Sequence, residues 1–181
     1  MTEKRIVNTV RKENNMQLIQ CTKKLADEMK IKVQKVDAAD FNPLYCWHAN
    51  LFKIGRKKCV IVMNNATRYH FVIYGVLKKD LQNLHLVFKE NLVTNLLLSG
   101  MKPEMIERYL NEDQNIQYAA TNNRSIISQM NDAVFAVEHF FYQESIIDLA
   151  SLNQYLNETV MLKLPKYPVE MMREALLEIK R

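Results

Sequence analysis

The sequence feature that most constrains the fold is a stretch from residue 45 to residue 76, in which three strand-like patterns follow one another across two short turns. Residues 45–54 alternate between two faces, and residues 67–76 alternate again after a turn rich in asparagine. Between them, residues 59–63 are apolar on both faces, as in a central strand that is covered on both sides. This pattern predicts a three-stranded antiparallel meander.

The flanking segments add strands and helices to this meander. A short strand over residues 16–20 leads into a helix opened by Thr22, and a further strand is expected at 115–120. A long helix capped by Asp80 is predicted to end at Gly100, a short helix starts at Pro103, and another helix spans 123–142. The sequence therefore predicts an α+β fold in which helices cover a small, mostly antiparallel sheet.

Three regions are predicted along the 181 residues. Residues 1–15 form a leader with few apolar groups, 16–142 the α+β core, and 143–181 a helical C-terminal extension. The last helix, opened by Pro168, carries an apolar seam of the kind that lies against one partner surface. That surface is either the chain's own core or another chain, as in a homo-oligomer. The seam consists of Val169, Met172, Leu176 and Ile179.

Composition and charge indicate an ordinary soluble domain. No apolar stretch approaches the roughly 20 residues that cross a bilayer, and no apolar secretory signal opens the chain, so a cytoplasmic protein without membrane contact is expected. Cys21, Cys46 and Cys59 include no close pair and are interpreted as reduced core thiols. The net charge of +5 permits nucleic-acid binding without requiring it. The three glycines form no phosphate-binding loop, and no cofactor is predicted.

Three motifs carry a resemblance to a known family. They are Cys21-Thr-Lys-Lys-Leu, Trp47-His-Ala-Asn-Leu-Phe, and Asn123-Arg-Ser followed by Met130-Asn-Asp. With them, the region of about residues 16–142 resembles a family of small bacterial proteins recorded only as a domain of unknown function. The resemblance implies no activity, cofactor or partner. Where that family carries a small glycine before the last serine, this chain has Ile127-Ser128-Gln129.

Polar residues on the predicted strands suggest one candidate catalytic site. His48 and His70 could serve as acid and base, with Arg68 or Arg124 holding a phosphate, which is the minimum equipment for metal-independent cleavage of RNA. Asn50 lies on the same strand face as His48. Buried polar side chains that tie strands and loops together are commoner than active sites, so the interpretation favours a structural role.

Two further site hypotheses rest on weaker patterns. Ser125, Asn131 and Asp132 could help the start of the 123–142 helix to bind an anion, although ordinary capping and a solvated face explain them as well. A metal site could be drawn from cysteines and histidines of the meander, but the close ligand pairs of a zinc site are missing and no metal is predicted. The residues considered for the metal are Cys46, His48, Cys59 and His70.

The basic residues suggest a surface for a partner. Arg56, Lys57 and Lys58 lie in the first hairpin, and lysine pairs occur at 23–24 and 78–79. Such clusters could contact a nucleic-acid backbone, while lysines on turns also serve as solvated edges that deter strand pairing. The sequence therefore predicts a non-catalytic binding or regulatory domain that acts on a protein or nucleic acid. The alternative is a small metal-independent phosphodiester-cleaving enzyme.

Overall fold

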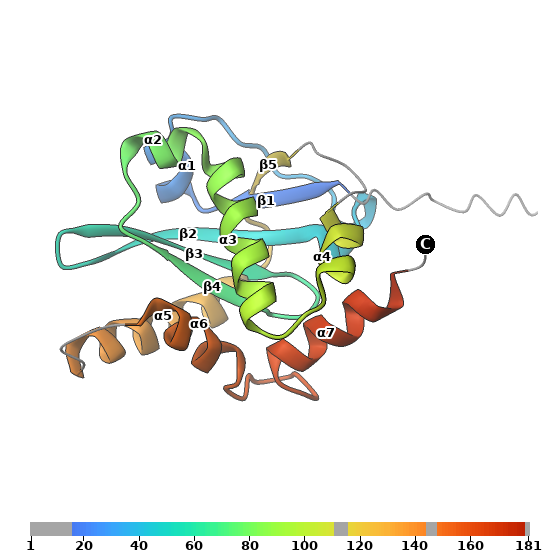
Figure 1. Cartoon of the computed structure of the whole chain (residues 1–181). Helices are drawn as coiled ribbons and strands as arrows, with labels where there is room; N and C mark the ends of the chain where they lie inside the picture. Colours follow the sequence, from blue (N-terminus) through green and yellow to red (C-terminus); the bar gives the residue numbers. More distant parts are fainter. Residues whose placement is uncertain (1–15, 111–115, 144–147, 180–181) are drawn as a thin grey trace, which may run out of the picture.

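The computed structural model describes residues 16–110, 116–143 and 148–179, which form a five-stranded sheet with helices on both faces (Figure 1). Two short 3₁₀ helices, Ala38–Asp40 and Pro43–Tyr45, precede the second strand. The strands are β1 Gln17–Cys21, β2 Cys46–Ile54, β3 Lys57–Asn64, β4 His70–Tyr74 and β5 Ile116–Ala120; the helices are α1 Lys23–Met29, α2 Lys78–Gln82, α3 Leu84–Leu98, α4 Pro103–Leu110, α5 Arg124–Gln143, α6 Leu149–Asn157 and α7 Pro168–Glu178.

The sheet has the strand order β4-β3-β2-β1-β5 and is mixed. The predicted meander is confirmed, because β2 pairs antiparallel with β3 and β3 with β4. The first strand instead lies between β2 and β5 and is parallel to both, with Ile19 opposite Trp47 and Tyr118. The sheet is thus antiparallel on one side and parallel on the other, and the α+β class is confirmed with this refinement.

One face of the sheet carries the larger core, which is covered by α1, α3, α4 and α7. The predicted alternation along β2 and β4 places Trp47 and Phe71 on this face. The Trp47 ring lies edge-on to Phe88 of α3, with ring centroids 5.3 Å apart. Its indole Nε1 donates to Gln17 Oε1 at 3.1 Å, so the buried polar atom is satisfied.

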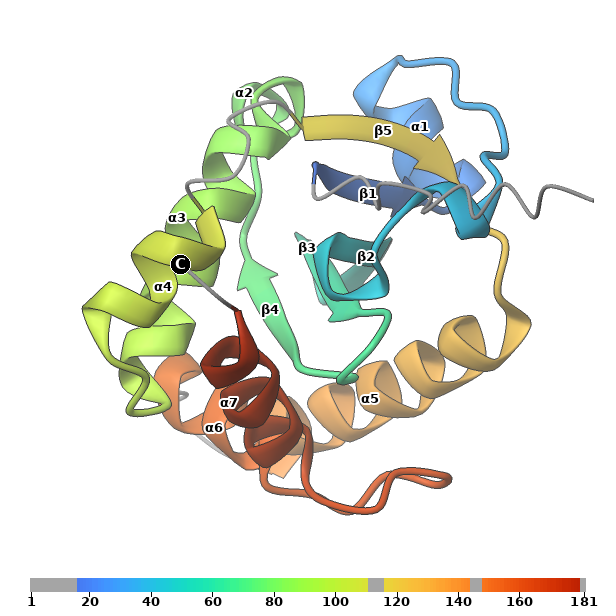
Figure 2. The same cartoon turned by 90° about the vertical axis from the view of Figure 1, so that its right-hand side faces the viewer.

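The other face is covered by α5 and α6. Phe52, Ile61, Met63 and Val72 point from the sheet toward apolar residues of these two helices. As Figure 2 shows, α5 runs beneath the strands, and α6 and α7 lie near the β4 edge. Because β3 is buried on both faces, both layers are needed to exclude water from it. The helical residues of this second core are Ile126, Met130, Ala133, Val137, Leu152 and Leu156.

The predicted helix starts are confirmed in part. The Thr22 side chain accepts a hydrogen bond from the Leu25 N–H, and α4 begins at Pro103. The helix expected from Asp80 to Ser99 is divided at Asn83 into α2 and α3. Asp80 was expected to be the cap but lies inside α2, where its carboxylate accepts from the N–H of Leu77. The prediction failed there because the chain enters this helix earlier, at residue 78.

The apolar seam of α7 packs on the chain's own core. Met172 and Leu176 are fully buried, and Val169 and Ile179 pack against the same cluster. Helix α6 also contributes Leu152 and Leu156 to the core beneath the sheet. The division of the chain at residue 142 stays a prediction, and residues 1–15 lie outside the described part.

Helix α6 closes the open edge of β4. The Oδ1 atoms of Asn157 and Asn153 accept from the backbone N–H groups of His70 (2.9 Å) and Val72 (2.8 Å). Their Nδ2 groups donate to the carbonyls of the same two residues. Both asparagines are buried. An edge strand that would otherwise offer free N–H and C=O groups to another chain is therefore paired by side chains.

Replacing Asn157 should test how much this edge contributes to stability. Asn157→Leu leaves the His70 N–H and C=O without partners, so the free energy of unfolding should fall by about 2–4 kcal/mol. Gln154→Ala, on the exposed side of the same helix, should change it by less than about 0.5 kcal/mol. Urea denaturation of both variants measures the difference. Equal stability of the two variants would contradict the role assigned to Asn157.

Candidate functional site

A chain of hydrogen-bonded polar side chains lies on the α5 side of the sheet. We call it the polar network. It runs from the end of β5, across β1 and β2, to the turn between β3 and β4 and on to α5. Alternation in β1 and β2 brings Gln20 and His48 side by side, since the two residues are register partners in the parallel pair. The polar network consists of Gln20, His48, Asn65, Arg68, Asn122 and Gln129.

The directions of these bonds fix the protonation of His48. Gln20 Nε2 donates to Asn122 Oδ1 at 2.8 Å, and Asn65 Nδ2 donates to Gln20 Oε1 at 2.7 Å. Asn65 Oδ1 thus faces His48 Nδ1 at 2.7 Å, which must carry the hydrogen. His48 is fully buried, and its Nε2 has no partner in the described part of the chain. Burial lowers the pKa of this histidine, opposed by the Asn65 bond and aided by the Arg68 charge.

Arg68 is the junction of the polar network. It has a left-handed backbone with φ of 59°, which is uncommon for a residue other than glycine. Its guanidinium donates from Nη1 to the carbonyl of Asn65 and from Nε to Gln129 Oε1 at 2.7 Å. No carboxylate among the described residues forms an ion pair with it. Burial lowers its pKa, because the charge is partly removed from water.

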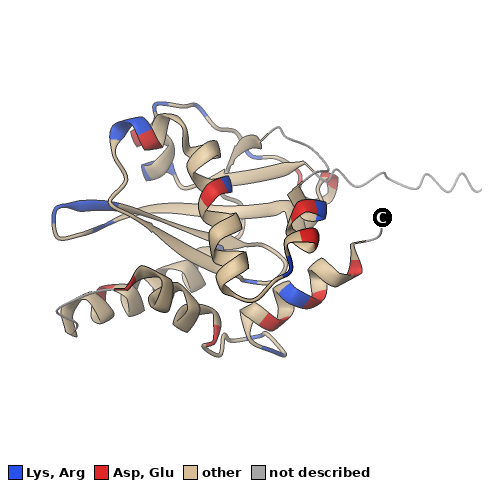
Figure 3. Cartoon of the chain, viewed as in Figure 1, with Lys and Arg blue, Asp and Glu red and all other residues tan. Residues whose placement is uncertain are grey.

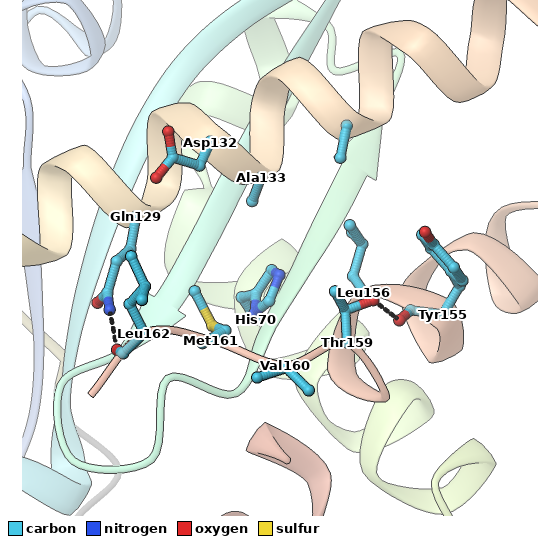
Figure 4. Close-up of a pocket in the computed structure, with 11 residues that line it drawn as sticks. His70, Gln129, Asp132, Ala133, Tyr155, Leu156, Thr159, Val160, Met161 and Leu162 are labelled. Atoms are coloured by element: carbon cyan, nitrogen blue, oxygen red, sulfur yellow. Dashed lines mark hydrogen bonds between the residues drawn. The ribbon is translucent and has the colours of Figure 1, made fainter. Parts of the chain in front are cut away.

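His70 is attached to the same turn. Its Nδ1 lies 2.8 Å from the carbonyl oxygen of Arg68, which can only accept, so Nδ1 carries the hydrogen. Burial lowers the pKa of His70 to about 4. The ring lines a cavity of about 270 Å³ between α5, α6 and the segment 159–162 (Figure 4). Gln129 lines the same cavity and donates to the carbonyl of Leu162 at 3.1 Å.

The structure brings some of the predicted site residues together and leaves others apart. His48, Arg68 and His70 are joined through Asn65 and the Arg68 backbone. Arg124 is exposed at the start of α5, outside the polar network.

The remaining predicted polar residues have separate surroundings. Asn50 Oδ1 accepts from the Thr22 hydroxyl at 2.9 Å, which links β2 to the start of α1. The backbone N–H of Ser125 donates to Asn123 Oδ1, as expected of ordinary helix capping. Asn131 and Asp132 are exposed on α5, and Asp132 lines the cavity beside His70.

Four members of the polar network were not predicted as site residues: Gln20, Asn65, Asn122 and Gln129. Gln20 could have been recognised as a polar residue on the inner face of an apolar strand. Asn65 belongs to the asparagine-rich turn of the meander, and Asn122 directly precedes the predicted helix at 123–142, so local patterns indicate only turn and cap roles for them. Gln129 carries no signal of its own, because its partner Arg68 lies 61 positions earlier in the chain.

The cysteines and histidines considered for a metal are spread over the sheet. All three cysteines are buried and free of disulfides. Burial raises the pKa of Cys21 and Cys46 to about 12, so both are neutral thiols. Within residues 16–110, 116–143 and 148–179, no three histidine, cysteine, aspartate or glutamate side chains gather in a way that could hold a metal ion.

The basic residues of the hairpin, α1 and α2 gather at one end of the molecule (Figure 3). We call this surface the basic end. Lys58 is bound to Glu28 of α1, and the Lys58 carbonyl accepts from Val76 N–H, just before α2. These two contacts tie the three segments together. The basic end comprises Lys23, Lys24, Lys53, Arg56, Lys57, Lys58, Lys78 and Lys79.

A comparison with family models matches residues 18–171 to Domain of unknown function (DUF6933). The chain belongs to this family. The predicted resemblance is confirmed, and the match extends beyond the expected region of residues 16–142, through α6 and into the first turn of α7. A bacterial origin stays a prediction. The comparisons with curated proteins and with solved structures give no match.

The buried histidines predict a loss of stability in acid. His70 has a pKa of about 4 in the folded chain and about 6.5 when unfolded, so below pH 6.5 the unfolded chain takes up the proton first. Its contribution is complete above pH 6.5 and is lost progressively as the pH falls from 6.5 to 4. Between pH 7 and pH 5 this should lower the free energy of unfolding by about 2 kcal/mol.

Urea denaturation of the wild type, His70→Leu and His85→Gln at both pH values measures this contribution. The His70 variant should lose most of the 2 kcal/mol difference, while the variant at exposed His85 should keep it. The same pH dependence in all three proteins would show that His70 is not buried in its neutral form.

Proposed function

We propose that this chain is a non-catalytic domain that binds nucleic acid through the basic end, in the cytoplasm. The observation that carries the proposal is the convergence of three basic segments that are far apart in the sequence. Residues 23–24, 53–58 and 78–79 lie together near the turn of the β2–β3 hairpin (Figure 3). A cluster of this kind can neutralise several backbone phosphates at once.

The basic end holds more positive charge than its own acids offset. Lys53 lies directly opposite Lys58 in the β2–β3 pair, where like charges repel. Lys58 is paired with Glu28, and Lys23 with Asp27. Among the described residues, Lys53, Arg56 and Lys57 have no acidic partner within salt-bridge distance. Glu28, which already binds Lys58, offsets only part of the charge of Lys53, and the positive charge that remains supports an anionic partner at this surface.

Aromatic side chains lie next to the basic end. Tyr74 is the register partner of Cys59, which directly follows Lys58, and 41% of its surface is exposed. Its ring stacks on Phe141 at a centroid distance of 5.1 Å. Tyr142, the next residue of α5, is 90% exposed. Exposed aromatic rings beside cationic groups are the combination on which unpaired bases stack while phosphates are neutralised.

The alternative of a phosphodiester-cleaving enzyme has weaker support. His48 and His70 are both buried, and each has Nδ1 committed to a bond inside the fold. His48 Nε2 is shielded from solvent, and Arg124 is not part of the polar network. General acid–base catalysis requires both groups to reach a substrate in one open pocket. His48 and His70 instead link parts of the fold, and a binding domain does not need them to reach a ligand.

Binding to a labelled single-stranded RNA of about 20 nucleotides, followed by fluorescence anisotropy, tests the proposal. The dissociation constant should rise steeply with salt, with a slope of about −0.7 per phosphate contact on logarithmic axes. Arg56→Glu with Lys57→Glu should weaken binding at least about tenfold and flatten this slope. Both residues are exposed, and neither contributes to a described core cluster.

A charge-matched control separates a local effect from net charge. Lys102→Glu with Lys163→Glu changes the net charge equally, at exposed positions outside the basic end. This control should leave the dissociation constant within about twofold, because distant surface charges are screened. Equal weakening by both double variants, or binding independent of salt, would refute the proposed surface. RNA cleavage that is lost in His48→Ala would instead support the enzyme alternative.

A further inference from the structure

The cavity under α5 points to a second binding site, separate from the basic end. We propose that it binds a small aromatic molecule that carries one hydrogen-bond donor, of the phenol class, with the donor directed at His70. The site does not depend on the proposed nucleic-acid binding, since it lies between α5, α6 and the segment 159–162. Three features of the cavity indicate the class of ligand: its apolar walls, the side chain of His70 and the carboxylate of Asp132.

The walls of the cavity are mainly apolar. Ala133 and Ala136 of α5 form one side, Leu156 of α6 another, and Val160 and Met161 a third (Figure 4). The two alanines leave room where larger side chains would fill the space. Its volume of about 270 Å³ is well above the roughly 150 Å³ of an apolar protein cavity that accepts a benzene ring. A single aromatic ring therefore fits without displacing the walls.

His70 supplies a specific polar contact. Only 2% of its surface is exposed, and the ring lines the cavity. Nδ1 is held as a donor to the Arg68 carbonyl, so in the neutral ring Nε2 is an acceptor. Nε2 has no hydrogen-bond partner in the described part of the chain. Unlike His48 Nε2, this atom is not sealed inside the fold, so it is open to the cavity and can accept a hydrogen bond from a ligand donor there.

The charge of the residues that line the cavity disfavours negatively charged ligands. Asp132 supplies the one carboxylate among the residues that line the cavity. A carboxylate ligand would meet this negative charge and a histidine nitrogen that accepts rather than donates. A neutral hydroxyl or ring N–H meets no such repulsion and matches the acceptor. The site therefore favours phenol over benzoate, and over a ring that has no donor.

Phenol and toluene, which have nearly the same shape, test the inference. Toluene is the more apolar and should bind more tightly to a cavity that offers only apolar contact. If the hydroxyl reaches His70 Nε2, phenol should instead bind about tenfold more tightly than toluene. Amide chemical shifts of the full chain during each titration give both dissociation constants, and the ring nitrogens of His70 should shift with phenol alone.

Two variants separate the cavity from its polar contact. His70→Leu should reverse the preference in favour of toluene, and Ala136→Leu should abolish binding of both by filling the space. Ala150→Leu on α6, outside the lining, should leave both constants unchanged. Tighter binding of toluene to the wild type, or no shifts around the cavity with either compound, would overturn the proposal. The wild-type comparison decides the question even if a variant fails to fold.

Discussion

The rest of the structure depends on β3 being buried on both faces. Residues 59–63 have no measurable exposure, although they alternate between two opposite cores. A strand of this kind requires a layer on each side of the sheet. Helices α1, α3, α4 and α7 provide one layer, and α5 and α6 provide the other. Helices α6 and α7 come late in the sequence, whereas β3 lies in its first half. Both helices cover the sheet around this central strand, which explains why they contribute fully buried side chains.

The same constraint decides where polar groups can lie. The turn from Asn64 to Arg68 is buried at Asn64 and Thr67 and exposed at Ala66, so the polar groups of its buried part must be satisfied internally. Asn64 does this by donating to the Leu44 carbonyl and accepting from the N–H groups of Ala66 and Thr67. The Thr67 hydroxyl reaches the Met172 sulfur of α7 at 3.6 Å. Arg68 extends the arrangement to α5. This partly buried turn thereby connects the two layers through hydrogen bonds as well as through apolar contact.

Much of the fold could be predicted from local sequence, but contacts between distant segments could not. The meander, the strand faces of Trp47 and Phe71, and the Thr22 cap follow from alternation and capping within a few residues. The parallel placement of β1 between β2 and β5 depends on pairing across the chain, which no local pattern encodes. The candidate site shows the same limit. His48, Arg68 and His70 could be selected by residue type, whereas Gln129 and the edge-pairing Asn153 and Asn157 are meaningful only beside partners more than 60 positions away.

The two buried histidines show why residue type alone predicts too many catalytic residues. Each is a neutral ring whose Nδ1 donates inside the fold, and the two differ in what surrounds the rest of the ring. His48 Nε2 is sealed beneath α5, so that ring can act only through the stability of the polar network. The His70 ring lines a cavity that a small molecule can enter. Because access rather than basicity distinguishes the two rings, a ligand can recognise His70 directly, whereas His48 contributes by holding the Asn65–Arg68 turn in place.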